Sequence, residues 1–319
     1  MDLPLDAALS IGFIAGAPSR AAAREVAGLA TRLGYDSIWV GDHVAFPMPI
    51  LDPFQQLAQI AMHAEGVTLG TCVFLLPLRH PVLVAKQVAT LDRLCDGRFV
   101  FGVGIGGEFP AEYAACEVPH RERGARLTAA IPIVRALVRG EPARGDGRFH
   151  HFPETRLAPA AVQPGGPPIW CGGRAPAALR RIGRLADGWV SYVVTPERYR
   201  GGLEQVAKAA AECGRRLDRF GTGHLLFTRI DDDADVSLDH AAAHLSQRYA
   251  MDFRDAARRY AALGPPAAVA DRIDAFRRAG VRSLILDMTG PPGARDEQLA
   301  RFAEEVRPLL GSAVSGEDA

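Results

Sequence analysis

The chain has 319 residues, of which 48% are hydrophobic and 23% charged, and this balance is ordinary for a globular enzyme. Its 37 basic and 37 acidic residues give a formal net charge of zero, so the overall charge does not favour nucleic acid or an acidic membrane as a partner. Neither a signal peptide nor an apolar run of membrane-spanning length is visible, and the five scattered cysteines contain no CxxC pair. We therefore expect a cytoplasmic protein with free thiols.

In the first part of the chain, short apolar runs rich in β-formers alternate with helix-period segments. Ser19 and Asp52 precede two of the helical segments as N-caps, and Pro53 stands at a first helical position. Strands are predicted at 8–15, 37–40, 67–73 and 98–103, and the helices that follow them at 21–33, 53–64, 81–94 and 122–138.

The stretch 139–167 is rich in Gly, Pro and Arg and interrupts this alternation, with at most a short hairpin expected near 147–157. Residues 237–262 are predicted as an extra helix, and residues 311–319 as a disordered tail. The remaining strands are predicted at 169–171, 189–193, 223–230 and 282–287, and the remaining helices at 177–186, 197–213, 267–279 and 297–309.

Eight strand–helix units in succession predict a parallel sheet, and eight is the number that closes a barrel. The predicted fold class is therefore α/β, with one (β/α)8 TIM barrel over residues 1–310 and insertions after strands 4 and 7. An open doubly wound sheet is the alternative. Residues 11–17 (IGFIAGA) after the first strand do not supply the GxGxxG of a dinucleotide-binding fold.

In a barrel of this kind, the active site lies at the carboxyl ends of the strands. His43 follows the second strand, and its imidazole suits proton transfer near neutral pH, with a structural histidine as the alternative. Asp42 beside it is a candidate for orienting a neighbouring group or capping the next segment. Glu108, after the fourth strand, is either an acid or base of the site or a solvated loop carboxylate.

Glycines at two strand ends let the backbone approach a flat ligand, although tight turns explain some of them. They are Gly102, Gly104, Gly106 and Gly107 after the fourth strand, and Gly172 and Gly173 after the fifth. The second run precedes a helix whose first N–H groups suit a phosphate, and Arg174 adds positive charge there or is a surface arginine. No metal site is predicted, because HExxH and clustered Cys/His ligands are absent, and GxSxG of a hydrolase is absent too.

Four stretches carry a resemblance to the luciferase-like flavin-dependent oxidoreductases, and the resemblance as a whole extends over nearly the entire chain. They are LGYDSIWVGDHVAFP (33–47), LGTCVFLLPLRHPVLVAKQVATLDRLCDGRFVFGVGIGGEF (69–109), PPIWCGGRAPAALRRIGRLADGWV (167–190) and residues 265–287, which end AGVRSLILD. The resemblance implies a barrel whose mouth holds a flavin or deazaflavin ring. It places the family's strand-end histidine on His43, the glutamate of its deazaflavin-dependent dehydrogenases approximately on Glu108, and its phosphate loop on Gly172, Gly173 and Arg174.

The family's bulge after the third strand, which often carries a non-prolyl cis peptide behind the ring, falls on Thr71, Cys72 and Val73. The resemblance thus makes these three residues cofactor-binding candidates, together with Asp42. This chain departs from the family in having Cys72 where glycine is usual and Cys171 where an aliphatic residue is usual. Redox tuning and simple packing both stay open for these thiols. The loop after the second strand is short, which favours an open pocket or a bulky substrate.

Two catalytic hypotheses follow from the resemblance. In the favoured one, coenzyme F420 exchanges a hydride with an unknown organic substrate while His43, with Glu108, handles the proton. In the other, FMN that has been reduced by a separate flavin reductase reacts with oxygen in a monooxygenase. A non-catalytic flavin-binding barrel and a metal-dependent hydrolase are the hypotheses from other classes. A homodimer is expected by analogy with the family.

Overall fold

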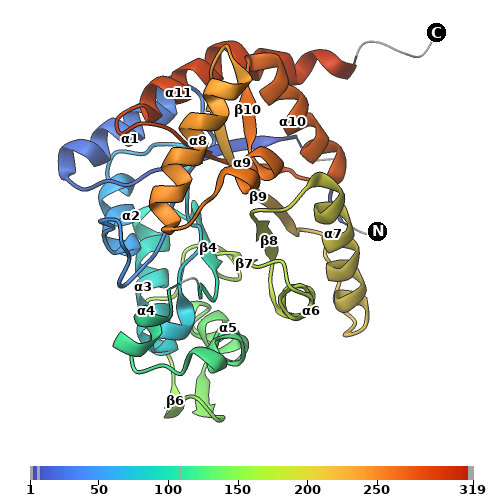
Figure 1. Ribbon diagram of the computed structural model, residues 1–319. Coiled ribbons are helices and arrows are strands. Elements are labelled where there is room, and N and C mark those ends of the chain that lie inside the picture. Colours follow the sequence, from blue (N-terminus) through green and yellow to red (C-terminus); the bar gives the residue numbers. More distant parts are fainter. Residues whose placement is uncertain (1–2, 6–7, 108, 315–319) are drawn as a thin grey trace.

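The computed structural model describes residues 3–5, 8–107 and 109–314, and in it eight parallel strands close into a barrel ringed by helices (Figure 1). β1 pairs with both β2 and β11, and the pairing of β8 with β9 completes the ring, so the predicted barrel is confirmed. The strands are β1 (Ser10–Ile14), β2 (Ser37–Val40), β3 (Thr68–Thr71), β4 (Phe99–Val103), β7 (Ile169–Gly172), β8 (Gly188–Ser191), β9 (Gly221–Ile230) and β11 (Ser283–Met288).

Two indole rings fill the interior of the barrel. The ring centroids of Trp39 and Trp170 are 5.6 Å apart, and the rings pack with inward-facing aliphatic side chains of β4, β8 and β11. Glycine makes room for each ring, because a Cβ on Gly70 would stand 2.4 Å from Trp39 and one on Gly221 would stand 2.1 Å from Trp170. The interior is therefore a packed core, and any site must lie at one end of the barrel.

The outer faces of the strands are covered by eight helices. Two of the predicted N-caps are confirmed: the Ser19 hydroxyl accepts the N–H of Ala22, and the Asp52 carboxylate accepts the N–H groups of Phe54 and Gln55. The helices are α1 (Arg20–Arg32), α2 (Pro53–Ala61), α3 (Pro81–Leu94), α5 (Arg123–Val138), α6 (Pro176–Leu185), α7 (Pro196–Ala211), α10 (Pro266–Ala279) and α11 (Arg295–Arg301).

The insertion after β4 contains short elements on both sides of α5. α4 (Pro110–Ala115) and the 3-10 turn η2 (His120–Glu122) precede that helix. The antiparallel hairpin of β5 (Ala143–Asp146) and β6 (His151–Thr155) follows it and projects away from the barrel (Figure 1). The hairpin was expected near 147–157, and it begins earlier because residue 147 lies in the turn and not in its first strand.

The insertion after β9 differs from the single helix predicted at 237–262. α8 (Ala234–Tyr249) stops where Ala250 takes a left-handed conformation with φ 52°, and the Ser246 hydroxyl then accepts the Phe253 amide. α9 (Arg254–Tyr260) and the short strand β10 (Ala262–Gly264) follow, and β10 adds to the edge of β9 beyond the barrel. In Figure 1, α8 and α9 lie in front of the strands.

The last helical segment continues past α11. It runs on as the π-helical η3 (Phe302–Val306) and the 3-10 η4 (Arg307–Val314). The expected tail began at residue 311, but the backbone is helical to Val314, and residues 315–319 lie outside the described residues. Within the described part of the chain, no helix combines the length and the apolar character needed to cross a bilayer.

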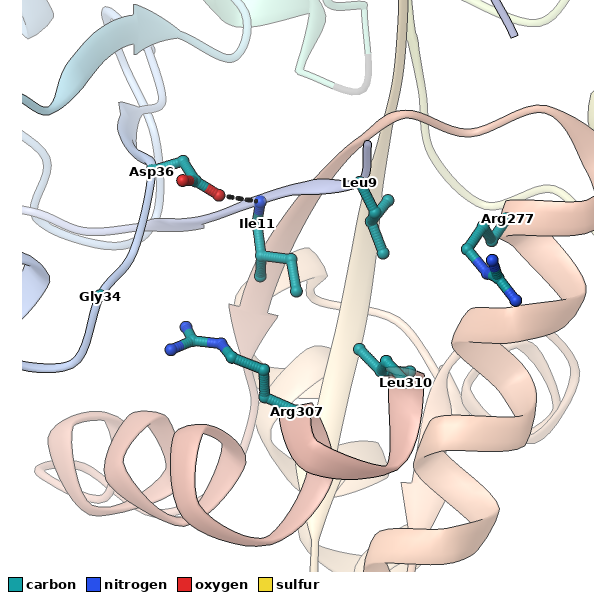
Figure 2. A pocket seen from close by; sticks show the side chains of 7 residues that line it. All are labelled: Leu9, Ile11, Gly34, Asp36, Arg277, Arg307 and Leu310. Carbon is teal, nitrogen blue, oxygen red and sulfur yellow. Dashed lines mark hydrogen bonds between the residues drawn. The ribbon is translucent and has the colours of Figure 1, made fainter. Parts of the chain in front are cut away.

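A pocket of about 340 Å³ opens at the amino ends of the strands, between β1 and the C-terminal helices (Figure 2). Asp36 points toward β1 and accepts the backbone N–H of Ile11 at 2.7 Å. The guanidinium of Arg307 packs on the Tyr35 ring and donates to the carbonyl of Leu33. These contacts tie the last helix to the first two strands, at the end of the barrel that serves stability.

Candidate active site

The other end of the barrel brings together the residues that the sequence placed at strand ends. Because the strands are parallel, the segments after β2, β3, β4 and β7 meet at one rim. Predicted candidates described at this rim are Asp42, His43, Thr71, Cys72, Val73, Gly104, Gly106, Gly107, Gly172, Gly173 and Arg174. Glu108, the second predicted catalytic residue, lies outside the described residues.

A buried carboxylate stands directly behind His43. Oε1 of Glu112, in the first turn of α4, is 2.8 Å from His43 Nδ1, and the Glu112 side chain is only 3% exposed. Its other oxygen accepts the Val44 backbone N–H at 2.6 Å. An ionised carboxylate only accepts hydrogen bonds, so His43 carries its proton on Nδ1 and presents the lone pair of Nε2. This arrangement makes Nε2 a proton acceptor.

The prediction missed Glu112, which lies four residues after Glu108. The sequence does contain a pattern that could have indicated it, because Glu112 is the single charged residue among small and aromatic residues (AEYAA). Such a pattern is typical of a short helix whose charged residue faces inward. The next residue, Tyr113, is also buried, and its hydroxyl donates to the carbonyl of Ile105 in the glycine-rich loop. α4 therefore supports both His43 and the loop after β4.

Two phenyl rings fix the orientation of the imidazole. Phe46 stacks on His43 with ring centroids 3.9 Å apart and an interplanar angle of 11°. Phe109 meets the imidazole edge-on at 5.8 Å between centroids and meets Phe46 at 4.9 Å. Phe46 thus covers one face of His43, and the imidazole side chain keeps 22% of its surface exposed.

Asp42 does not present its carboxylate to the mouth. The carboxylate is fully buried and forms two hydrogen bonds with the Arg79 guanidinium, at 2.5 and 2.8 Å. It also accepts the backbone N–H of Leu75 at 2.8 Å. Arg79 lies over the ring of Phe74, 4.3 Å from its centroid. These bonds give Asp42 a positioning role, in which it fixes the segment after β3 beside the His43 backbone, and its place among the cofactor-binding candidates stays a prediction.

The segment after β3 forms the back wall of the mouth. Thr71 is fully buried and donates its hydroxyl proton to the carbonyl of Gly102 at 2.7 Å, and its place among the cofactor-binding candidates stays a prediction. The peptide bond between Cys72 and Val73 is cis. Burial, with a smaller effect from the Asp287 carboxylate, raises the pKa of the Cys72 thiol to about 12. Cys72 is therefore a neutral thiol at physiological pH and no nucleophile.

Val73 explains two of the glycines at the rim. A Cβ on Gly104 would lie 2.3 Å from a Val73 methyl carbon, and one on Gly172 would lie 3.1 Å from the other. Gly106 and Gly107 have φ angles of 52° and 120°, which side chains adopt rarely. Gly104 and Gly172 therefore leave room for Val73, and Gly106 leaves room for Leu75, to which a Cβ would come within 2.9 Å.

The N-terminus of α6 has no side-chain cap. Its N-cap residue is Ala175, Pro176 occupies the first turn, and Gly173 before it has a φ of 126°. The exposed Arg174 guanidinium lies 5.0 Å from the centroid of the Tyr192 ring. Pro176 has no N–H and the Ala178 N–H bonds the Ala175 carbonyl at 2.8 Å, so it is the Ala177 N–H, the helix dipole and the nearby arginine that suit an anion such as a phosphate. Cys171 behind the loop is fully buried, and burial raises its pKa to about 12.

A charged pair that the prediction missed closes the rim on the side of α8. Asp287 lies on the inward face of β11, two residues after Ile285, and it pairs with Arg248 of α8 at 2.5 and 3.1 Å. His244 contacts Arg248 through Nε2 at 2.8 Å and the Gly290 carbonyl through Nδ1 at 2.6 Å. This network docks the inserted helix onto the barrel mouth. Among the described residues, no cluster of His, Cys, Asp and Glu has the arrangement of a metal site.

Comparison with known proteins identifies the family. The family model described as luciferase-like monooxygenase matches residues 9–305. The chain belongs to this family. Its relatives include F420-dependent dehydrogenases and flavin-dependent monooxygenases, so the protein is an oxidoreductase of the class that uses F420 or a flavin. The resemblance noted in the sequence is thereby confirmed at the level of family, fold and cofactor class.

Two relatives and one solved structure illustrate the proteins to which this chain is similar. F420-dependent glucose-6-phosphate dehydrogenase of Nakamurella multipartita is 29% identical over 314 residues, covering 88% of this chain and 90% of that protein. The oxygenase component of flavin-dependent trigonelline monooxygenase of Acinetobacter baylyi is 33% identical over 154 residues, covering 48% of this chain and 42% of that protein. The structure of an F420-dependent secondary alcohol dehydrogenase with an F420-acetone adduct has a TM-score of 0.82 at 18% identity, covering 95% of this chain and 99% of that one.

Proposed function

We propose that this protein is an F420-dependent dehydrogenase or reductase, which exchanges a hydride between the deazaflavin and a carbon atom of an organic substrate. The observation that carries the proposal is the His43–Glu112 pair at the barrel mouth, a histidine held by a buried carboxylate in a proton-accepting form. Hydride transfer from an alcohol carbon releases the hydroxyl proton as well, so the reaction needs such a base beside the cofactor.

The residues at the mouth fit a cofactor of this type. The uncapped first turn of α6, with Arg174, would hold the phosphate of the side chain. The backbone of Gly104, Gly106 and Gly107, with the side chain of Val73, would border the ring system, because these three loop residues carry no side chain of their own. F420 supplies a ring carbon that accepts or returns a hydride when it is bound.

The side chains of this chain then handle the proton. Nε2 of His43 accepts the proton of the substrate hydroxyl during oxidation, and it returns a proton in the opposite direction. Glu112 fixes the tautomer and stabilises the positive charge that the imidazole gains. Phe46 and Phe109 hold the ring in place and limit access of water to it. Glu108 remains a proposed second acid or base.

The choice of F420 over FMN also draws on the extent of the similarity. The F420-dependent relative from Nakamurella multipartita aligns over 88% of this chain, whereas the trigonelline monooxygenase component aligns over 48%. The second candidate function, an FMN-dependent monooxygenase supplied by a flavin reductase, is favoured by that shorter but slightly more identical match.

Equilibrium titration of the purified protein with F420 and with FMN, followed by cofactor fluorescence, tests the proposal. We expect saturable binding of F420 and weaker binding of FMN. The His43→Gln variant should bind F420 as tightly as the wild-type protein does but should have lost turnover. A non-catalytic flavin-binding protein would show no turnover in the wild-type form either. Tight binding of FMN without binding of F420 would replace the proposal by the monooxygenase function.

A further inference from the structure

A basic groove starts beside the proposed phosphate loop and follows α6 along the outside of the barrel. It has a volume of about 320 Å³ and lies between α6 and α5, which are neighbours in Figure 1. On α6 it is lined by Arg180, Arg181 and Arg184, and its apolar floor includes Pro132 of α5 and Leu185. The groove is therefore a site of positive charge outside the barrel mouth.

The positive charge of this groove is not neutralised by the protein. Neither α5 nor α6 contains an acidic residue. Within the described part of the chain, Arg180, Arg181 and Arg184 form no ion pair, and Arg181 donates only to the Thr128 hydroxyl, at 2.8 Å. The carboxylate of Asp187, just beyond the end of α6, is already paired with Arg135.

What sets these three arginines apart is that they lie on one face of one helix, on a chain whose formal net charge is zero. Seventeen close ion pairs are formed elsewhere among the described residues, and most of them use arginine. Three neighbouring guanidinium groups without carboxylates raise the local potential and attract a polyanion. Arginine also suits carboxylates in particular, because its planar fork donates two parallel hydrogen bonds.

The groove begins within one helical turn of the site proposed for the cofactor phosphate. Ala177, the first residue of α6 that lines it, is only three residues after Arg174 of the phosphate loop. From Ala177 to Leu185, the helix extends for about 12 Å at 1.5 Å per residue. The groove is therefore within short reach of a chain that leaves a phosphate at the N-terminus of α6.

We infer that this groove binds the oligoglutamate tail of F420, an inference that rests on the proposed function. Beyond its phosphate, F420 carries a lactyl group and a chain of glutamyl units, each with a carboxylate, whereas FMN ends at the phosphate. The arginines at 180, 181 and 184 pair with the carboxylates of the first glutamyl units. The groove thereby favours the deazaflavin over FMN through contacts remote from the ring.

The test compares F420 that carries glutamyl units with its glutamate-free form in fluorescence titrations at low salt. The variants are Arg180→Glu/Arg184→Glu in the groove and, as a control with the same change of charge, Arg20→Glu/Arg24→Glu on exposed positions of α1. The wild-type protein and the control should bind the glutamylated form about tenfold more tightly than the glutamate-free form. Each exposed ion pair contributes little by itself, but several act together. The groove variant should lose that preference, and added salt should reduce it in the wild-type protein.

The outcomes separate the two proposals. Equal affinity of the wild-type protein for both forms, or a preference that the groove variant retains, would overturn the inference and leave the proposed function standing. If neither form binds to the wild-type protein while FMN does, the proposed function fails and the inference falls with it. Circular dichroism of each variant confirms that a change in affinity is not a loss of fold.

Discussion

Replacing Glu112 with glutamine removes the charge behind His43 while keeping the size of the side chain. The carboxylate accepts hydrogen bonds from three donors, which are His43 Nδ1 at 2.8 Å, the Val44 N–H at 2.6 Å and the Ala45 N–H at 3.4 Å. Glutamine offers one acceptor oxygen and an NH2 group, so at least one of these donors loses its partner. For a side chain that is only 3% exposed, we expect a loss of about 1–3 kcal/mol in the free energy of unfolding.

The same substitution should allow the neutral imidazole of His43 to populate both its Nδ1–H and its Nε2–H tautomer. In the wild-type protein, ¹⁵N NMR of the imidazole at neutral pH should report a proton on Nδ1, and Glu112→Gln should increase the Nε2–H form. With a substrate in hand, kcat should fall by about 10²-fold, the usual share of general acid–base catalysis, while F420 affinity stays nearly constant. Glu65→Gln, at an exposed position, is the control. A wild-type His43 with its proton on Nε2 would refute the reasoning.

Three other predictions test separate parts of the structure. Arg79→Met should lower the free energy of unfolding by about 3–5 kcal/mol in urea denaturation, because it leaves the Asp42 carboxylate buried without its partner; a change below about 1 kcal/mol would contradict the positioning role. Burial lowers the pKa of His224 to about 3, so the folded protein binds fewer protons than the unfolded chain between that pH and about 6.5. Stability should fall by about 1.4 kcal/mol per pH unit of acidification below 6.5, and His224→Asn should make that slope shallower. Iodoacetamide at pH 8 should label the exposed Cys213 and leave Cys72 unmodified in the folded protein, because a thiol with a pKa of about 12 is only ~10⁻⁴ ionised at that pH. Mass spectrometry of the peptides measures the labelling of each cysteine.

The sequence was sufficient to predict the barrel, because each strand–helix unit has a recognisable pattern of apolar and polar residues in its own segment. Ser19 and Asp52 cap helices where the pattern predicts caps, and strand ends locate the rim without knowledge of any contact. The structure of the insertion after β9 was harder to predict. A helical pattern from 237 to 262 contains no Gly or Pro, and the break at Ala250 depends on how α8 packs on the barrel.

The roles of individual site residues were less predictable, since they depend on contacts between distant segments. Asp42 looks like a site residue beside His43, yet its carboxylate faces Arg79, thirty-seven positions later in the chain. Glu112 is the residue that contacts His43, across sixty-nine positions, and a one-dimensional pattern does not reveal that contact. Arg248 and Asp287 are likewise paired only by the docking of α8.

The central claim is that the protein transfers a hydride and does not oxygenate its substrate. The most direct measurement is turnover with F420 under strictly anaerobic conditions, across a panel of alcohols and sugar phosphates, followed by loss of the visible absorption of the oxidised cofactor. We predict F420 reduction that proceeds equally well without oxygen and that is abolished in His43→Gln. Product formation that requires oxygen and reduced FMN, with no reduction of F420, would contradict the account.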